Sequence, residues 1–106
     1  MRRIQLVLTS ALALPSLAAA PADHVIHQQG RAFSSTVITV ARGQPVTFLK
    51  DDTVPHNVMS TSPDNAFNLG SQVPGTATPV TFDRAGIVAV ICAIHPRMRM
   101  TIIVNN

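Results

Sequence analysis

The sequence predicts an all-β fold, a Greek-key β-sandwich of about seven or eight strands. Beyond residue 22, short runs rich in β-branched residues alternate with clusters of Gly, Pro, Asn and Asp. This alternation is typical of sandwiches and barrels. The same part of the sequence does not repeat apolar residues with the period of an amphipathic helix. The 106 residues are enough for a single domain.

The expected strands lie on both sides of a looser region, about residues 57–79, which contains one short strand. They are, in turn, one starting near residues 25–26, then 36–40, 46–49, a short one around Phe67, 80–83, 87–92 and 101–104. Because the turn residues 42–45 lie between two alternating runs, the second and third strands have a hairpin-like pattern. Residues 87–92 are apolar at every position, which indicates a central strand that ends at Cys92.

Residues 1–22 are typical of a secretory signal peptide. Arg2 and Arg3 precede a mostly apolar run, and small residues lead to a cleavage site that we place after Ala22. The apolar run is about half the ~20 residues that a membrane-spanning helix needs. We therefore expect export to the periplasm of one domain, residues 23–106, without a membrane span. A buried N-terminal helix is the structural alternative.

The charge of the expected mature chain is close to neutral. Its six basic residues exceed its five acidic residues by one. Within residues 23–106, Arg97 and Arg99 are the only basic residues that lie close together in the sequence. Because nucleic-acid binding needs a clustered basic face, we expect no nucleic-acid partner.

The cysteine content points to a metal. Small exported domains are usually stabilised by disulfides or metals. Cys92 is the only cysteine, which excludes an internal disulfide. An unpaired thiol in an exported protein forms an intermolecular bond, reacts, or binds a metal.

The residues that follow Cys92 favour copper as that metal. A thiolate, an imidazole and a thioether occur within the seven-residue stretch from Cys92 through His95 to Met98. His56 offers a second imidazole from an upstream loop. Two His, one Cys and a weak axial Met are the ligands of a blue-copper electron-transfer site. Zinc is the rival, but a thioether is a poor fourth ligand for structural zinc.

Nearly all of the chain beyond residue 22 resembles the cupredoxins, and most closely the amicyanin and plastocyanin type. The matching segments are Val46-x-Phe48 followed by Asp52, Pro55-His56-Asn57-Val58, Val73-Pro74-Gly75, Thr81-Phe82-x-x-x-Gly86, Cys92-x2-His95-Pro96-x-Met98 and Ile102-x-Val104. The short spacing between the last Cys, His and Met resembles the amicyanin loop.

The resemblance implies a role for each residue of the site. His56 and His95 resemble the nitrogen ligands of one copper ion. Cys92 resembles the thiolate ligand and Met98 the axial thioether. The backbone N–H and side chain of Asn57 would support the sulfur and tie the two loops together, as an outer partner of a metal site does.

Met100 is the alternative axial ligand, with a longer spacing from His95. It shares strand parity with Ile102 and Val104, which favours core packing and leaves Met98 as the predicted ligand.

The other polar candidates have simpler interpretations. His24 and His27 face opposite sides of a strand near the mature N-terminus and are expected to be solvated; a loose second copper site is the alternative. Asp51 and Asp52 are expected in a solvated turn. Since no third group is evident to orient a Cys–His pair, we expect no enzyme activity.

The resemblance implies a periplasmic type 1 copper protein that transfers single electrons by Cu(I)/Cu(II) cycling, as a monomer. Its expected partner is a periplasmic dehydrogenase or a c-type cytochrome. Arg97 and Arg99 would rim an apolar patch around the exposed edge of His95. A copper carrier or resistance protein with the same ligands, and a metal-free sandwich used in adhesion or assembly, are the alternatives.

Overall fold

The computed structural model describes residues 3–5 and 24–106. The expected signal peptide and its cleavage site fall on residues 1–22, which lie outside the described residues except for 3–5. Within the described ranges, no helix has the length and apolar character needed to cross a membrane.

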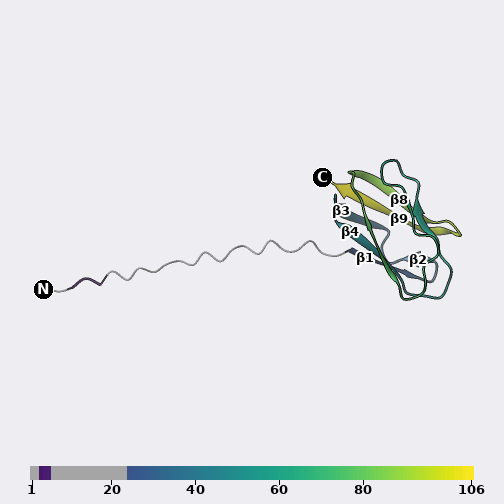
Figure 1. Ribbon diagram of the computed structural model, residues 1–106, viewed down its shortest axis with the longest axis horizontal. Coiled ribbons are helices and arrows are strands. Elements are labelled where there is room, and N and C mark those ends of the chain that lie inside the picture. The colour runs from purple at the N-terminus through teal and green to yellow at the C-terminus, as the bar shows by residue number, and fades with distance from the viewer. Residues whose placement is uncertain (1–2, 6–23) are drawn as a thin grey trace.

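The described chain is all β, as predicted, and contains nine strands rather than the expected seven or eight. They are β1 (His24–Gln29), β2 (Ala32–Phe33), β3 (Val37–Ala41), β4 (Pro45–Lys50), β5 (Val58–Ser60), β6 (Phe67–Asn68), β7 (Ala77–Thr81), β8 (Gly86–Cys92) and β9 (His95–Asn105) (Figure 1). The sequence pattern did not indicate β2 or β5, which are only two and three residues long.

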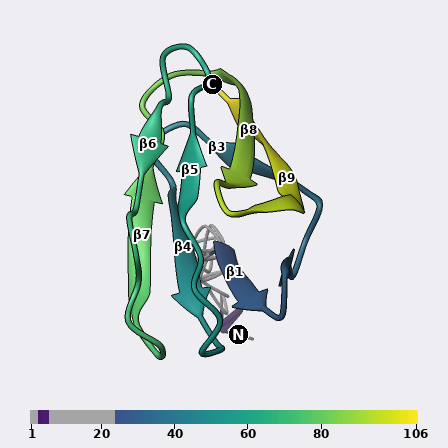
Figure 2. The same ribbon diagram turned by 90° about the vertical axis from the view of Figure 1, so that its right-hand side faces the viewer.

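The strands form two sheets that share one core, and strands of the two sheets overlap in the view of Figure 2. One sheet has the order β2-β1-β4-β7 and the other the order β3-β9-β8-β5-β6. β1 runs parallel to β4, and β3 runs parallel to β9, whereas the remaining neighbours are antiparallel. Parallel neighbours require long connections, so both pairs join strands that are distant in the sequence.

The prediction of a hairpin between residues 36 and 49 is wrong, because β3 and β4 do not pair with each other. β3 pairs with β9, and β4 pairs with β1 and β7, so the turn between β3 and β4 carries the chain from one sheet to the other. The turn is anchored on both sides, because Arg42 N–H donates to Asn105 C=O and Gly43 N–H donates to Phe82 C=O. A local turn signal does not say whether the next strand pairs with the previous one or crosses the core.

The core lies between the sheets and contains a chain of four phenylalanine rings. Phe48, on β4, is fully buried between Phe33 and Phe67, with ring centroids 6.4 and 5.8 Å away. Phe67 in turn contacts Phe82 at 5.8 Å. Because Phe48 and Phe67 belong to different sheets, the ring chain joins the two layers. Burying each large apolar side chain contributes about 1.5–3 kcal/mol.

β8 is a central strand, as predicted, since it lies between β9 and β5. Only one of its faces is buried, however. Val88 and Val90 are fully buried, whereas Ile87 is 70% exposed. The apolar residues on its outer face therefore do not reflect a second buried layer.

Candidate metal centre

A two-residue hairpin places Cys92 and His95 directly opposite each other. Cys92 ends β8, His95 begins β9, and the two are register partners across the ladder. Directly opposed residues of an antiparallel pair project from the same face of the sheet. The register then shifts, because Ile91 pairs with Arg99, and residues 96–98 bulge out of the ladder. We call residues 92–98 the ligand hairpin.

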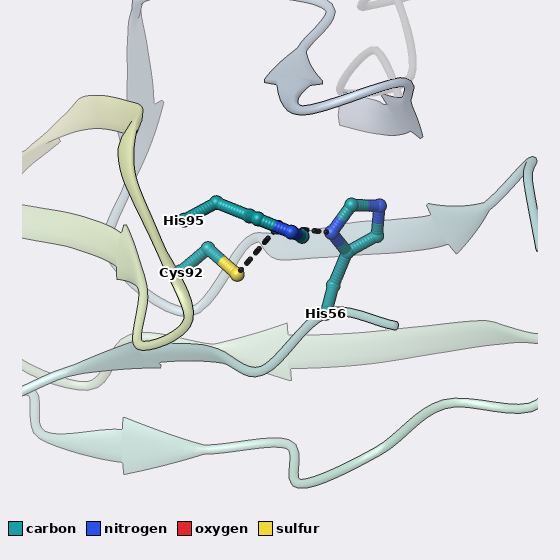
Figure 3. A group of neighbouring side chains, drawn as sticks. All are labelled: His56, Cys92 and His95. Carbon is teal, nitrogen blue, oxygen red and sulfur yellow. Dashed lines mark hydrogen bonds between the residues drawn. The ribbon is translucent and has the colours of Figure 1, made fainter. Parts of the chain in front are cut away.

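His56 reaches the same point from the loop between β4 and β5. This loop crosses from one sheet to the other, and its histidine is buried, with 3% of its surface exposed. Figure 3 shows the His56 ring directed toward His95 and Cys92. The two imidazole rings meet edge to face, with centroids 5.1 Å apart and an interplanar angle of 73°.

The facing atoms of these three side chains have separations that suit a shared metal ion. His56 Nδ1 lies 3.1 Å from His95 Nδ1, and Cys92 Sγ lies 3.6 Å from His95 Nδ1. All three ligand atoms lie within 4.8 Å of one another. An ion about 2.0–2.1 Å from nitrogen and about 2.3 Å from sulfur would hold neighbouring ligand atoms about 3.3–3.8 Å apart. One thiolate and two imidazoles also fit the preference of copper for soft sulfur and nitrogen donors.

Met98 and Met100 occupy different kinds of position. Met98, with 1% exposure, lies in the bulge of the ligand hairpin and belongs to the same buried cluster as Cys92. Met100, with 4% exposure, stands in the regular ladder opposite Val90. Pairing with β8 therefore constrains the backbone at Met100, whereas Met98 lies in the bulge outside the regular pairing.

Asn57 joins the two loops of the site through its backbone. Its N–H donates to Cys92 Sγ at 3.4 Å, and its C=O accepts from Ala93 N–H at 3.0 Å. The Asn57 side-chain oxygen is buried and has no hydrogen-bond partner within residues 3–5 and 24–106. The contact with the sulfur is thus made by the main chain alone in the described structure.

The sequence suggested that Asp52 lies in a solvated turn, but its side chain is largely shielded from solvent. Only 14% of its side chain is exposed, and both of its carboxylate oxygens accept from His56 Nε2, at 3.1 and 3.2 Å. Gly30 N–H also donates to the carboxylate, at 2.6 Å. Lys50, which is 2% exposed, donates from Nζ to Asp52 Oδ1 at 2.5 Å.

These contacts keep the Asp52 carboxyl ionised. Burial raises its pKa, but the hydrogen bonds from Lys50, His56 and the Gly30 amide outweigh burial and lower the pKa from 3.8 to about 2. The strand pattern contained the signal for this network. Lys50 shares parity with the buried Val46 and Phe48 on β4, and an inward lysine needs an anionic partner.

His95 is the ligand candidate that meets the surface. It lines a shallow depression of about 690 Å³ together with Arg31, Ile94, Pro96 and Arg97. Desolvation lowers the pKa of His95, and the charges of His56 and Arg31 lower it further.

The rim of this depression differs in part from the expected one. Arg97 lines it, as expected, whereas Arg99 donates from Nε to Pro96 C=O at 2.7 Å and braces the ligand hairpin. Arg31, from the turn between β1 and β2, was not predicted. It is distant from the hairpin in sequence, and the parallel pairing of β1 with β4 brings it to this end of the sandwich.

His24 and His27 lie on β1, away from the three clustered side chains. His27 Nδ1 pairs with the Asp51 carboxylate, and both side chains are partly exposed. In the part of the chain that the structure describes, His56, Cys92 and His95 form the one cluster of three or more His, Cys, Asp or Glu side chains suited to a metal.

Comparisons with known proteins point to the same chemistry. The sequence profile described as "Copper binding proteins, plastocyanin/azurin family" matches residues 22–105. No curated protein matches the sequence. Among solved structures, amicyanin from Paracoccus versutus is 27% identical, with a TM-score of 0.71, over 83% of this chain and 87% of that chain.

Two further structures support the fold. A Cu(I) form of an amicyanin mutant is 24% identical, with a TM-score of 0.71, over 83% of this chain and 87% of its own. A reduced amicyanin mutant is 24% identical, with a TM-score of 0.70, over 78% and 82% of the two chains. The profile match covers most of the sequence, and the His–Cys–His cluster fits one copper ion. The chain therefore belongs to the plastocyanin/azurin family of copper-binding proteins, the cupredoxins, which carry electrons and are not enzymes.

Proposed function

We propose that this protein is a type 1 copper protein that carries single electrons in the periplasm by cycling between Cu(I) and Cu(II). His56, Cys92 and His95 are the proposed equatorial ligands, and Met98 is the proposed axial ligand. The observation that carries the proposal is the convergence of one sulfur and two nitrogen atoms within 4.8 Å from two separate loops.

When bound, copper supplies a reversible one-electron change, and the chain supplies a cage that resists rearrangement. Cys92 and His95 are held by the ladder between β8 and β9. Asn57 N–H donates to the sulfur, and His56 is backed by the Asp52 carboxylate. Ligands held in this way move little when the charge on the ion changes, which favours fast electron transfer.

Export is part of the proposal. The leader pattern at residues 1–22 supports a cleaved signal peptide and a mature domain of residues 23–106. The family profile begins to match at residue 22, where that pattern ends.

The test is to load the purified protein with copper and record its absorption, its electron paramagnetic resonance spectrum and a redox titration. We expect one copper per chain, an intense visible band in the oxidised form and reversible bleaching on reduction. Because the chain has no Trp and no Tyr, its near-ultraviolet absorbance will be weak beside the visible band. A colourless protein that holds only Cu(I) would favour a copper carrier, and a protein without stoichiometric copper would contradict both functions.

Met98→Leu is expected to retain copper and raise the reduction potential. Leucine is similar in volume but lacks the thioether donor that stabilises Cu(II), and the axial ligand tunes the potential of such sites. Met100→Leu is the matched control, because it makes the same change two residues along the same strand, and its potential should stay unchanged. The reverse result would assign the axial role to Met100.

The depression beside His95 is the proposed electron port. The His95 ring connects the cluster with the surface, next to Ile94, which is 54% exposed. Arg31 and Arg97 line the same depression, and neither forms an ion pair with any residue that the structure describes. Small interfaces with electrostatic steering are typical of transient redox complexes. A dehydrogenase or c-type cytochrome with carboxylates around its own port fits this surface.

Removing a positive charge at the port is expected to slow electron transfer to an anionic oxidant but not to a cationic one. We expect Arg31→Ala and Arg97→Ala each to lower, by several-fold, the rate at which hexacyanoferrate(III) oxidises the reduced copper protein. The cationic oxidant tris(phenanthroline)cobalt(III) should react faster with the same variants. Arg84→Ala is the control, because it removes one positive charge near the start of β8, at the far end from the port. Equal effects of all three variants would contradict a port at His95.

A further inference from the structure

We infer that Lys50 and Asp52 form a charge pair that orients His56 and sets the balance between the two copper valences. The negative charge of Asp52 favours Cu(II), and the positive charge of Lys50 favours Cu(I). This inference rests on the proposed copper site. It concerns residues that do not themselves supply metal ligands.

The His56 ring is oriented by Asp52. Its Nε2 faces both oxygens of an ionised carboxylate, at 3.1 and 3.2 Å, so Nε2 carries the proton that it donates to Asp52. The lone pair is then left on Nδ1, the atom that lies 3.1 Å from His95 Nδ1. A carboxylate behind a metal-binding histidine selects its tautomer and makes it a more basic ligand.

The charge pair and His56 have little exposed surface. The side chain of His56 is 1% exposed, that of Lys50 is 2% exposed and that of Asp52 is 14% exposed. Charges with so little water around them are weakly screened. The Asp52 carboxylate lies one imidazole ring away from the metal-facing atoms, so its negative charge favours the more positive Cu(II). The positive charge of Lys50 acts in the opposite direction.

Lys50 also holds the loop that carries His56. Its Nζ donates to Asp52 C=O at 2.9 Å, to Asp52 Oδ1 at 2.5 Å and to Val54 C=O. An ammonium group has three donors, and all three are used. Asp52 and Val54 lie four and two residues before His56, so the lysine fixes the backbone that leads to this histidine.

The experiment compares reduction potentials and copper affinities of the copper-loaded protein with those of Asp52→Asn and Lys50→Met. Asp52→Asn keeps the shape and an acceptor but removes the charge. We expect its affinity for Cu(II) to fall about 10–100-fold, with a smaller loss for Cu(I). Each tenfold preferential loss of Cu(II) raises the potential by about 59 mV. Lys50→Met should lower the potential.

Opposite shifts separate a charge effect from a structural one, because both substitutions remove hydrogen bonds from the same loop. Asp83→Asn is the control, since it removes an exposed carboxylate just after β7, at the far end of β4, and should leave the potential unchanged. Shifts in the same direction, or no shift in Asp52→Asn, would overturn the inference. Asp52→Glu, which restores the charge, should return the potential toward that of the unaltered protein.

A readout without copper covers a Lys50→Met variant that fails to fold. Nitrogen-15 NMR of the metal-free protein should show His56 protonated at Nε2, and Asp52→Asn should weaken that preference. Protonation at Nδ1 in the unaltered protein would overturn the positioning role. Absence of a blue copper centre in the unaltered protein would instead overturn the proposed function, so the two failures are distinguishable.

Discussion

Replacing Cys92 with serine is expected to abolish the visible absorption band and to weaken copper binding by more than roughly 100-fold, beyond the loss that follows removal of an outer partner. A serine hydroxyl stays protonated near neutral pH and is a hard oxygen donor, so it can neither transfer charge to Cu(II) as a thiolate does nor bind Cu(I) well. The change is small in volume at a side chain with 2% exposure, and Asn57 N–H retains an acceptor. Absorption spectra and competition with a chelator measure both effects.

Ala93→Ser is the control for this experiment. It introduces the same hydroxyl into the ligand hairpin at an exposed position and leaves the three clustered side chains intact. Its spectrum and affinity should match those of the unaltered protein. A Cys92→Ser protein that stays blue would show that the sulfur is not a ligand.

Phe48→Ala is expected to destabilise the metal-free domain by about 3–5 kcal/mol. Phe48 has no exposed surface and lies between Phe33 and Phe67, so its loss opens a cavity in the chain of rings that joins the two sheets. At about 0.05–0.15 kcal/mol per residue, a domain of this size has only about 4–13 kcal/mol of stability in total. The substitution should therefore remove a large share of the stability of the metal-free domain.

Chemical denaturation with and without copper measures this effect. Copper binds the folded state, so excess metal should restore part of the lost stability by mass action. Phe33→Ala is the comparison, because Phe33 is 9% exposed and, among the described residues, its ring contacts only that of Phe48. Its cost should be smaller, and an equal cost for the two variants would contradict the bridging role of Phe48.

The approximate positions of the longer strands were predictable from the sequence, whereas their partners were not. Residues 36–40 and 46–49 alternate clearly, and both regions form strands, β3 and β4. Their separation into different sheets depends on pairing with β9, β1 and β7, which are distant in the sequence. β9 also begins at His95, six residues earlier than the expected strand at 101–104, because pairing with β8 extends it.

The residues of the site were likewise only partly predictable from the sequence. The short spacing of Cys92 and His95 was visible in the sequence, and the structure brings both side chains to His56. The positions of Asp52 and Arg31 beside the histidines depend on how the β4–β5 loop and the β1–β2 turn are carried to this end of the sandwich. That placement is a property of the sheets and has no local pattern.

The bulge in the ligand hairpin separates the length of this loop from the pairing of the two strands that it joins. The ladder between β8 and β9 continues unbroken up to Ile91 and Arg99, and it resumes only at Cys92 and His95. Among the described residues, 96–98 have no ladder partners. The register of β8 and β9 up to Ile91 and Arg99 therefore does not depend on the length of that loop.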